Sequence, residues 1–171
     1  KEMNKSFIPG ILSSANLCLG VISITQGFRN NILASALCII SAAFIHIYGG
    51  RLALTVNAVS ITGKQLYPLS DFVSFGLAPA LLSWNLALSS FGVLGYIPLL
   101  LYPVCGAYNI AKSNALRLNE TCQGLPVTAA GIIYAVFSLS LLKLHAHAGI
   151  SAILLILLSY LMICKMKFRR L

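Results

Sequence analysis

The stretch from His46 to Asp71 carries an imidazole, a phenol and a carboxylate between long hydrophobic segments. Asp71 is the only acidic residue between Glu2 and Glu120. An ionisable group inside an apolar helical bundle costs free energy, so such a residue marks a candidate functional site. A carboxylate can act as a base or bind a metal, and an imidazole can do the same. A phenol is the weaker candidate, because an ordinary tyrosine has a pKa of about 10.

Helical periodicity brings these side chains onto shared faces. Gly63, Tyr67 and Asp71 are four residues apart and share one face of a helix, with Ser74 close to it. The end of the preceding helix carries a similar stripe: His46, Gly49, Gly50 and Ala53. Small residues let two helices, or a helix and a ligand, approach closely. We therefore expect a close contact of one of these two kinds here.

The spacing resembles the signature of the CDP-alcohol phosphatidyltransferases, D-x2-D-G-x2-A-R-x8-G-x3-D-x3-D, without a gap. Gly50, Ala53, Gly63 and Asp71 stand where the signature has G, A, G and the last D. Other segments resemble the phosphatidylserine synthase branch of that family. They are IPGILSSANLCLG (8–20), VSFGLAPALL (73–82), QGLPVTAAG (123–131) and SYLMICKMKF (159–168). The resemblance therefore covers nearly the whole chain.

Several signature positions hold other residues. His46, Gly49 and Tyr67 stand where the signature has its first three aspartates, and Leu54 stands at its arginine. Asn109 stands where relatives usually carry arginine. The resemblance thus predicts that the scaffold is kept while much of the family's chemistry is removed.

The resemblance also implies a reaction and its participants. In the family, aspartates hold Mg²⁺ or Mn²⁺ against the pyrophosphate of CDP-diacylglycerol, and the last aspartate activates the acceptor hydroxyl, here that of serine. It implies a homodimer as well. Asp71 is then the residual base. Residues that match nucleotide- or lipid-binding positions are Gly50, Ala53, Gly63, Lys112 and Arg117.

The residues themselves leave alternatives open. His46 could bind Mn²⁺ or Zn²⁺ beside Asp71, although one carboxylate and one imidazole make a poor Mg²⁺ site. The simpler interpretation is a neutral His46 that is hydrogen-bonded within the bundle. Tyr67 then fills the space of the missing metal and aspartate.

Asp71 has a second interpretation beside that of a base. It is then a buried acid, either protonated or paired with Lys64, Arg51 or Lys112. Lys112 and Arg117 likewise either contact lipid phosphate or only set the membrane orientation of a loop.

Composition predicts the elements that position these residues. Hydrophobic residues make up 58% of the 171 residues and charged residues only 9%, whereas a globular domain has about 25% charged residues. A spanning helix needs about 20 apolar residues. We therefore predict an all-α, integral membrane bundle of six transmembrane helices, forming a single domain over residues 1–171. The expected spans are Phe7–Phe28, Asn31–Tyr48, Leu66–Ala87, Gly92–Ala111, Val127–Leu144 and Gly149–Cys164.

The basic residues predict the orientation. Only Arg29 and Lys143 fall on one side of the six-helix arrangement. The other side holds Lys1, Lys5, Arg51, Lys64, Lys112, Arg117, Lys165, Lys167, Arg169 and Arg170. Positive residues favour the cytoplasmic side. We therefore expect a multi-pass protein of a bacterial cell membrane, with both termini and the 46–71 stretch cytoplasmic. The net charge of +9 reflects this topology, so nucleic-acid binding has no part in the interpretation.

Two functions are favoured over a third, an unrelated small transporter or channel. One is a phosphatidylserine synthase-like enzyme that transfers phosphatidyl from CDP-diacylglycerol to serine and releases CMP. The other is a catalytically silent member of the fold, natural or engineered, that acts as a lipid-binding or dimer-forming membrane scaffold. The missing aspartates argue against turnover, and nothing in the sequence suggests the inverted repeats of a transporter.

Overall fold

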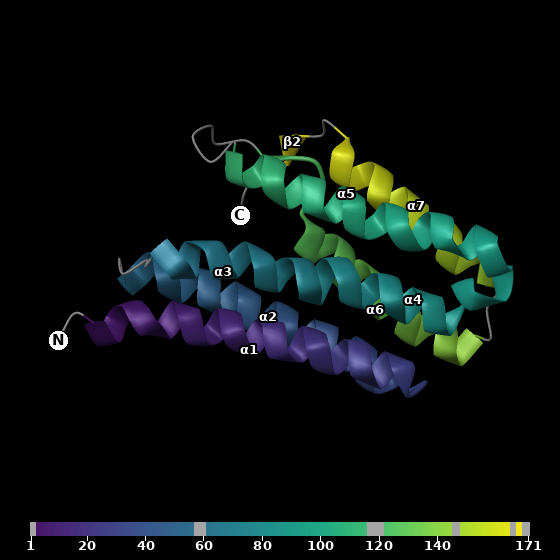
Figure 1. Ribbon diagram of the computed structural model, residues 1–171, viewed down its shortest axis with the longest axis horizontal. Helices are drawn as coiled ribbons and strands as arrows, with labels where there is room; N and C mark the ends of the chain where they lie inside the picture. The colour runs from purple at the N-terminus through teal and green to yellow at the C-terminus, as the bar shows by residue number, and fades with distance from the viewer. Residues whose placement is uncertain (1–2, 57–60, 116–121, 145–147, 165–166, 169–171) are drawn as a thin grey trace.

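The computed structural model shows a bundle of long helices (Figure 1). It describes residues 3–56, 61–115, 122–144, 148–164 and 167–168. The α-helices are α1 (Met3–Phe28), α2 (Ile32–Val56), α3 (Ile61–Asp71), α4 (Ala78–Leu86), α5 (Tyr96–Ala115), α6 (Val127–Leu144) and α7 (Ala148–Ile163). The remaining elements are the π-helix η1 (Phe72–Leu77), the 3₁₀-helix η2 (Leu88–Gly95) and two short strands, β1 (Cys122–Gln123) and β2 (Lys167–Phe168).

The predicted helical membrane bundle is confirmed. Four helical stretches are long and apolar enough to cross a membrane: Gly10–Phe28, Ile32–Leu52, Gly63–Leu86 and Leu88–Ala115. Two shorter apolar helices, α6 and α7, complete the bundle. The predicted span Val127–Leu144 coincides with α6. Helix α2 continues past the expected span end at Tyr48 to Val56, so the stripe of His46, Gly49, Gly50 and Ala53 is helical, as its spacing predicts.

Helices α1 and α2 form an antiparallel pair (Figure 1). The chain reverses at Asn30, whose φ of 57° is left-handed, a conformation that asparagine tolerates. The Asn31 side chain then accepts a hydrogen bond from the Ala34 N–H at 3.2 Å and caps the start of α2. Gly49 allows close packing farther along, because a Cβ there would lie 3.4 Å from the Leu12 Cβ.

A proline shapes the third span. Pro79 has no N–H, so the carbonyl four residues earlier, that of Phe75, loses its usual helical donor. The Tyr102 hydroxyl donates to this carbonyl at 3.1 Å instead. The chain around Phe75 widens into η1, in which the Ala78 N–H bonds to the Val73 carbonyl five residues back. Asp71 lies immediately before this widened segment.

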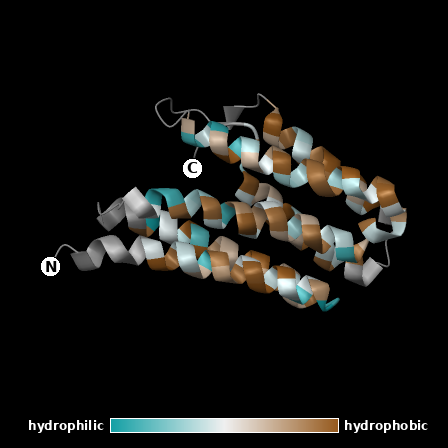
Figure 2. Ribbon diagram, in the orientation of Figure 1, coloured by the Kyte–Doolittle hydropathy of each residue, from teal (hydrophilic) through white to brown (hydrophobic). Residues whose placement is uncertain are grey.

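Small side chains dominate the interior, and many large apolar side chains are exposed on the exterior. Hydrophobic residues occur along the helices of the bundle (Figure 2). Buried hydroxyls pair between helices. Ser23 and Ser35 lie 2.9 Å apart, and Ser151 contacts Ser83 at 3.0 Å and Tyr134 at 2.6 Å. Such pairs satisfy polar atoms where water is excluded.

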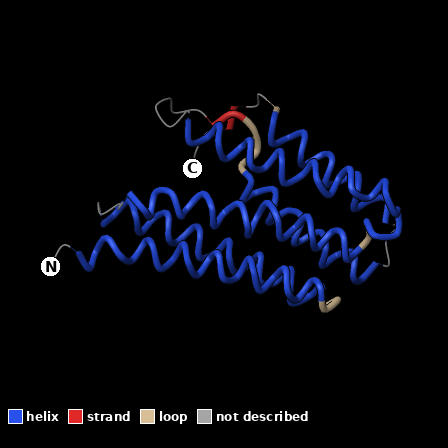
Figure 3. Tube along the Cα trace, in the orientation of Figure 1, coloured by secondary structure: helices blue, strands red, loops and turns tan. Residues whose placement is uncertain are grey.

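The described residues also include one sheet of two short strands. Strand β1 pairs antiparallel with β2, with Cys122 opposite Phe168 and Gln123 opposite Lys167 (Figure 3). Gly124 follows with a φ of 97° and lies so close to the Met162 carbonyl that a side chain would collide with it. The Leu125 N–H donates to the Leu161 carbonyl at 2.9 Å and joins the residues before α6 to the end of α7.

Candidate functional site

The site lies where α1, α2 and α3 meet. Asp71, the last residue of α3, is only 6% exposed. One of its carboxylate oxygens, Oδ1, lies 2.7 Å from Nδ1 of His46 on α2. The same oxygen accepts a hydrogen bond from the amide of Asn16 on α1 at 3.0 Å. The stretch from His46 to Asp71 thus brings its imidazole and its carboxylate into direct contact.

The other imidazole nitrogen contacts the phenol. His46 Nε2 lies 3.1 Å from the Tyr67 hydroxyl oxygen. The two rings stack with centroids 5.0 Å apart and planes inclined by 29°. Phe75 contacts the imidazole edge-on, with ring centroids 5.7 Å apart. These contacts hold the imidazole between Asp71 and Tyr67, so the three groups form one chain of hydrogen bonds.

Helix α1 supplies a residue that the motif does not contain. Asn16 is 2% exposed, and its backbone carbonyl accepts a hydrogen bond from the Ser74 hydroxyl at 2.8 Å. Its amide Nδ2 faces Asp71, while Oδ1 has no hydrogen-bond partner among the described residues. Leaving a buried acceptor unsatisfied costs about 1–3 kcal/mol. The Asn16 amide therefore bonds to the Asp71 carboxylate at the free-energy cost of leaving its own Oδ1 without a donor.

The sequence predicts only part of this role for α1. Ser13, Asn16 and Gly20 share one face, which indicates packing against neighbouring helices, and all three are buried. The contact between Asn16 and Asp71 is not predicted, because the two residues are 55 positions apart. The available signal is a lone asparagine within the first apolar span.

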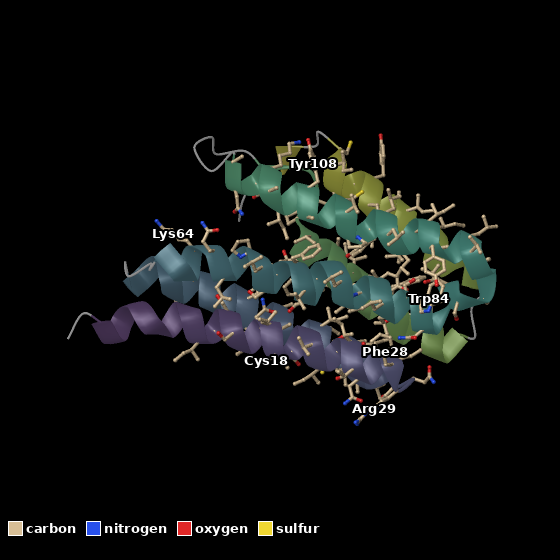
Figure 4. All side chains as sticks on the ribbon, viewed as in Figure 1. Cys18, Phe28, Arg29, Lys64, Trp84 and Tyr108 are labelled. Atoms are coloured by element: carbon tan, nitrogen blue, oxygen red, sulfur yellow. The ribbon has the colours of Figure 1, made fainter. Side chains whose placement is uncertain are left out.

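The predicted pairing of Asp71 with Lys64, Arg51 or Lys112 is wrong within the described part of the chain. The partner of Asp71 is His46. Lys64 and Arg51 are exposed, and Figure 4 shows Lys64 at the end of the bundle where α3 begins. The interpretation of His46 as a group hydrogen-bonded within the bundle agrees with these contacts.

The other motif positions lie around the same helices. Gly50 is next to Tyr67, since a Cβ there would lie 3.4 Å from the phenolic oxygen. Gly63 lies one turn before Tyr67 in α3. Ala53 and Leu54 continue α2, but their side chains lie outside the described part of the structure.

Of the two basic residues expected to contact lipid phosphate, the structure describes one. Lys112 lies in the last turn of α5 and is partly exposed. Arg117 lies outside the described residues. Their predicted contact with lipid phosphate stays a prediction.

Asn109, which stands where relatives usually carry arginine, forms a hydrogen bond between two helices. It is 7% exposed, and its amide donates to the Met162 carbonyl at 2.8 Å, one residue before α7 ends. The last carbonyls of a helix lack intrahelical partners. Asn109 therefore ties α5 to the end of α7.

The residues at the site do not fit a Mg²⁺ or Mn²⁺ cluster. These cations prefer several oxygen ligands. Here the single carboxylate is bonded to an imidazole and to an amide N–H group, and this N–H group is a donor that cannot act as a ligand. Within the described ranges, no group of three or more His, Cys, Asp or Glu side chains could hold a metal.

The fold and site define a class of protein: a multi-helix membrane bundle with a polar cluster where three helices meet. Comparison with known proteins names its family. The family model for CDP-alcohol phosphatidyltransferase matches residues 6–169. The chain belongs to the CDP-alcohol phosphatidyltransferase family, which is generally metal-dependent.

Individual relatives lie in the branch that the flanking motifs predict. The CDP-diacylglycerol–serine O-phosphatidyltransferase of Bacillus subtilis (strain 168) is 30% identical over 95% of this chain and 90% of its own length. The enzyme of that name from Mycobacterium leprae is 32% identical over 87% of this chain and 51% of its own length. An archaetidylserine synthase of Methanothermobacter thermautotrophicus is 28% identical over 95% of this chain and 70% of its own length.

Proposed function

We propose that this chain is a phosphatidylserine synthase-like membrane protein that has lost the family's metal-dependent transfer. Its relatives' names imply transfer of phosphatidyl from CDP-diacylglycerol to serine. The observation that carries the proposal is the state of Asp71. The remaining signature acid is already bonded to His46 and Asn16, in a set of side chains that does not suit a hard cation.

The retained function is lipid binding without the family's metal-dependent transfer. The small signature residues Gly50, Ala53 and Gly63 are kept, and these are the positions that would let a nucleotide or headgroup approach the helices. Exposed Arg51 and Lys64 lie near the same end and would attract an anionic headgroup. Large apolar side chains on the exterior suit contact with lipid chains. The homodimer implied by the resemblance belongs to this proposal as well.

A CMP-release assay tests the loss of transfer. The chain is reconstituted with CDP-diacylglycerol, serine and Mn²⁺ or Mg²⁺, with the Bacillus subtilis relative as a positive control. We expect no serine-dependent CMP release with Mn²⁺ or Mg²⁺ above that measured with EDTA. Metal-dependent release that Asp71→Asn abolishes would overturn the proposal. Binding is measured separately as an increase in melting temperature with CDP-diacylglycerol but not with phosphatidylcholine.

We further propose that the site faces the cytoplasm. Figure 4 shows Lys64 at one end of the bundle and Arg29 and Trp84 at the other, consistent with the predicted charge asymmetry. In sealed cells, an impermeant thiol reagent should label a cysteine introduced at Ser90 and miss one introduced at Lys64. Labelling with the opposite pattern would reverse the orientation.

A further inference from the structure

The hydrogen bonds of Asp71, His46 and Tyr67 run in one direction when Asp71 is ionised. An ionised carboxylate only accepts, so Nδ1 of His46 carries the proton that faces Asp71 at 2.7 Å. In the neutral imidazole, Nε2 is then an acceptor, and the Tyr67 hydroxyl at 3.1 Å donates to it. A nucleophile, a base and an acid that orients the base are thus connected in series. Covalent catalysis on unrelated folds uses this arrangement.

The base is held firmly in this series. The imidazole lies between the ring of Tyr67 and the edge of Phe75. Asp71 is held in turn by buried Asn16 at 3.0 Å. These contacts come from α1, α2, α3 and η1. A side chain that only filled the space of a lost metal would not require such alignment of both imidazole nitrogens.

The Tyr67 side chain is partly exposed, and its phenolic oxygen lies beside Gly50, where a Cβ would be 3.4 Å away. Lys64 lies one turn earlier in α3, on the same side of the helix as Tyr67, and is exposed (Figure 4). An ammonium group at this place can pair with a phosphate oxygen. The surroundings therefore favour an anionic phosphoester over a neutral acyl ester.

We propose that the Tyr67 oxygen is a nucleophile that attacks a phosphoester of a membrane lipid without a divalent cation. A bond forms between this oxygen and phosphorus, and the phosphorus–oxygen bond to the leaving group breaks. The Tyr67 proton passes to His46 Nε2 and from there to the leaving oxygen. A hydroxyl compound or water then attacks the phosphotyrosyl group, His46 takes its proton, and the proton returns to Tyr67. This activity goes beyond the proposed function and requires no metal.

In this mechanism His46 is the general base and Asp71 is a positioning residue. Asp71 does not exchange the proton; it holds the imidazole in the required tautomer and stabilises the imidazolium that forms. Asn16 supports Asp71 in the same way from α1.

The test measures the reactivity of Tyr67 directly. The intact chain in phosphatidylcholine nanodiscs, with EDTA present, is treated with dodecyl fluorophosphonate, and modified tyrosines are identified by mass spectrometry. The phenolic oxygen displaces fluoride from phosphorus in this reaction. Because a positioned general base accelerates such a step about 10²-fold or more, Tyr67 should be modified at least about tenfold faster than exposed Tyr108 and Tyr160.

Variants separate reactivity from structure. His46→Gln should reduce labelling of Tyr67 to the level of Tyr108, and Asp71→Asn should reduce it severalfold. Tyr108→Phe is the matched control and should leave labelling of Tyr67 unchanged. If His46→Gln does not fold, His46→Asn with an unchanged melting profile replaces it.

Three outcomes would overturn the proposal. One is labelling of Tyr67 no faster than that of Tyr108 and Tyr160. Another is labelling that is equal in a folded His46 variant. The third is labelling by a dodecanoyl p-nitrophenyl ester but not by the fluorophosphonate, which would refute phosphorus as the target. Because EDTA is present throughout, these outcomes are independent of the CMP-release assay.

Discussion

Replacing Gly20 by alanine tests the packing that brings α1 to the site. A Cβ at Gly20 would lie 2.5 Å from Ser74 Oγ, 2.9 Å from Ser74 Cα and 3.1 Å from Ser74 N. Two of these atoms belong to the backbone of η1, so a rotation of the serine side chain cannot relieve the contact. Helix α1 must shift away from η1, and this shift stretches the bond from Ser74 to the Asn16 carbonyl.

The expected cost follows from three contributions. Overpacking costs about 1–3 kcal/mol. A weakened hydrogen bond adds about 1 kcal/mol. Alanine offsets about 1 kcal/mol through its higher helix propensity. The net loss in free energy of unfolding is therefore about 1–3 kcal/mol, and each kcal/mol lowers the melting temperature by about 2–4 °C for a chain of this size.

Gly10 in the same helix provides the matched control. A Cβ at Gly10 meets nothing within 4 Å. Gly10→Ala should therefore leave the melting temperature unchanged or raise it slightly, whereas Gly20→Ala should lower it by several degrees. Thermal unfolding is followed by circular dichroism in one detergent for all three proteins. Equal melting temperatures for Gly20→Ala and the unmodified chain would refute the close contact between α1 and η1.

Three further predictions concern the freed carbonyl, the metal and the lost motif. Tyr102→Phe leaves the Phe75 carbonyl without its donor and should cost about 1–3 kcal/mol, while exposed Tyr108→Phe should cost almost nothing in the same unfolding assay. Mg²⁺, Mn²⁺ or EDTA should leave the melting temperature nearly unchanged; a saturable rise with Mn²⁺ would revive the metal hypothesis for His46 and Asp71. Restoring the signature should recover metal binding first, measured by calorimetry, and CMP release second; a restored chain that binds no divalent metal would show that the spacing does not mark a site. The restored set is His46→Asp, Gly49→Asp, Leu54→Arg and Tyr67→Asp.

Much of the fold is predictable from the sequence because it depends on local hydrophobic length. The segment Val127–Leu144 is largely apolar between polar stretches, and it is helical over those bounds. The end of α2 is not predictable from hydrophobic length, which ends the span at Tyr48. The spacing of His46, Gly49, Gly50 and Ala53 predicts that the helix goes on, and Gly49 and Gly50 contact α1 and α3 in a helix that ends at Val56. Tertiary packing outweighs the weak helix propensity of glycine here.

The site, too, is predictable from the sequence only in part. Helical spacing places Tyr67 and Asp71 on one face and predicts a close approach near His46. It does not predict the partners, since contacts with Asn16 and Phe75 depend on how α1 and the widened η1 pack. The π-helix itself requires knowledge that the Phe75 carbonyl, freed by Pro79, finds the Tyr102 hydroxyl on another helix.

The exchanged residues at the site depend on one another. A cluster of carboxylates needs cations, because like charges at short distance repel. One carboxylate with an imidazole and a phenol satisfies its hydrogen bonds without a cation. Changing His46 alone to aspartate would place two carboxylates together and remove the acceptor of the Tyr67 hydroxyl. Gly49→Asp alone would press against Leu12 on α1, since even a Cβ there lies 3.4 Å away. Single restorations should therefore destabilise the chain without restoring a metal site, whereas the full set can gain the cation that offsets its charges, so the effects should not be additive.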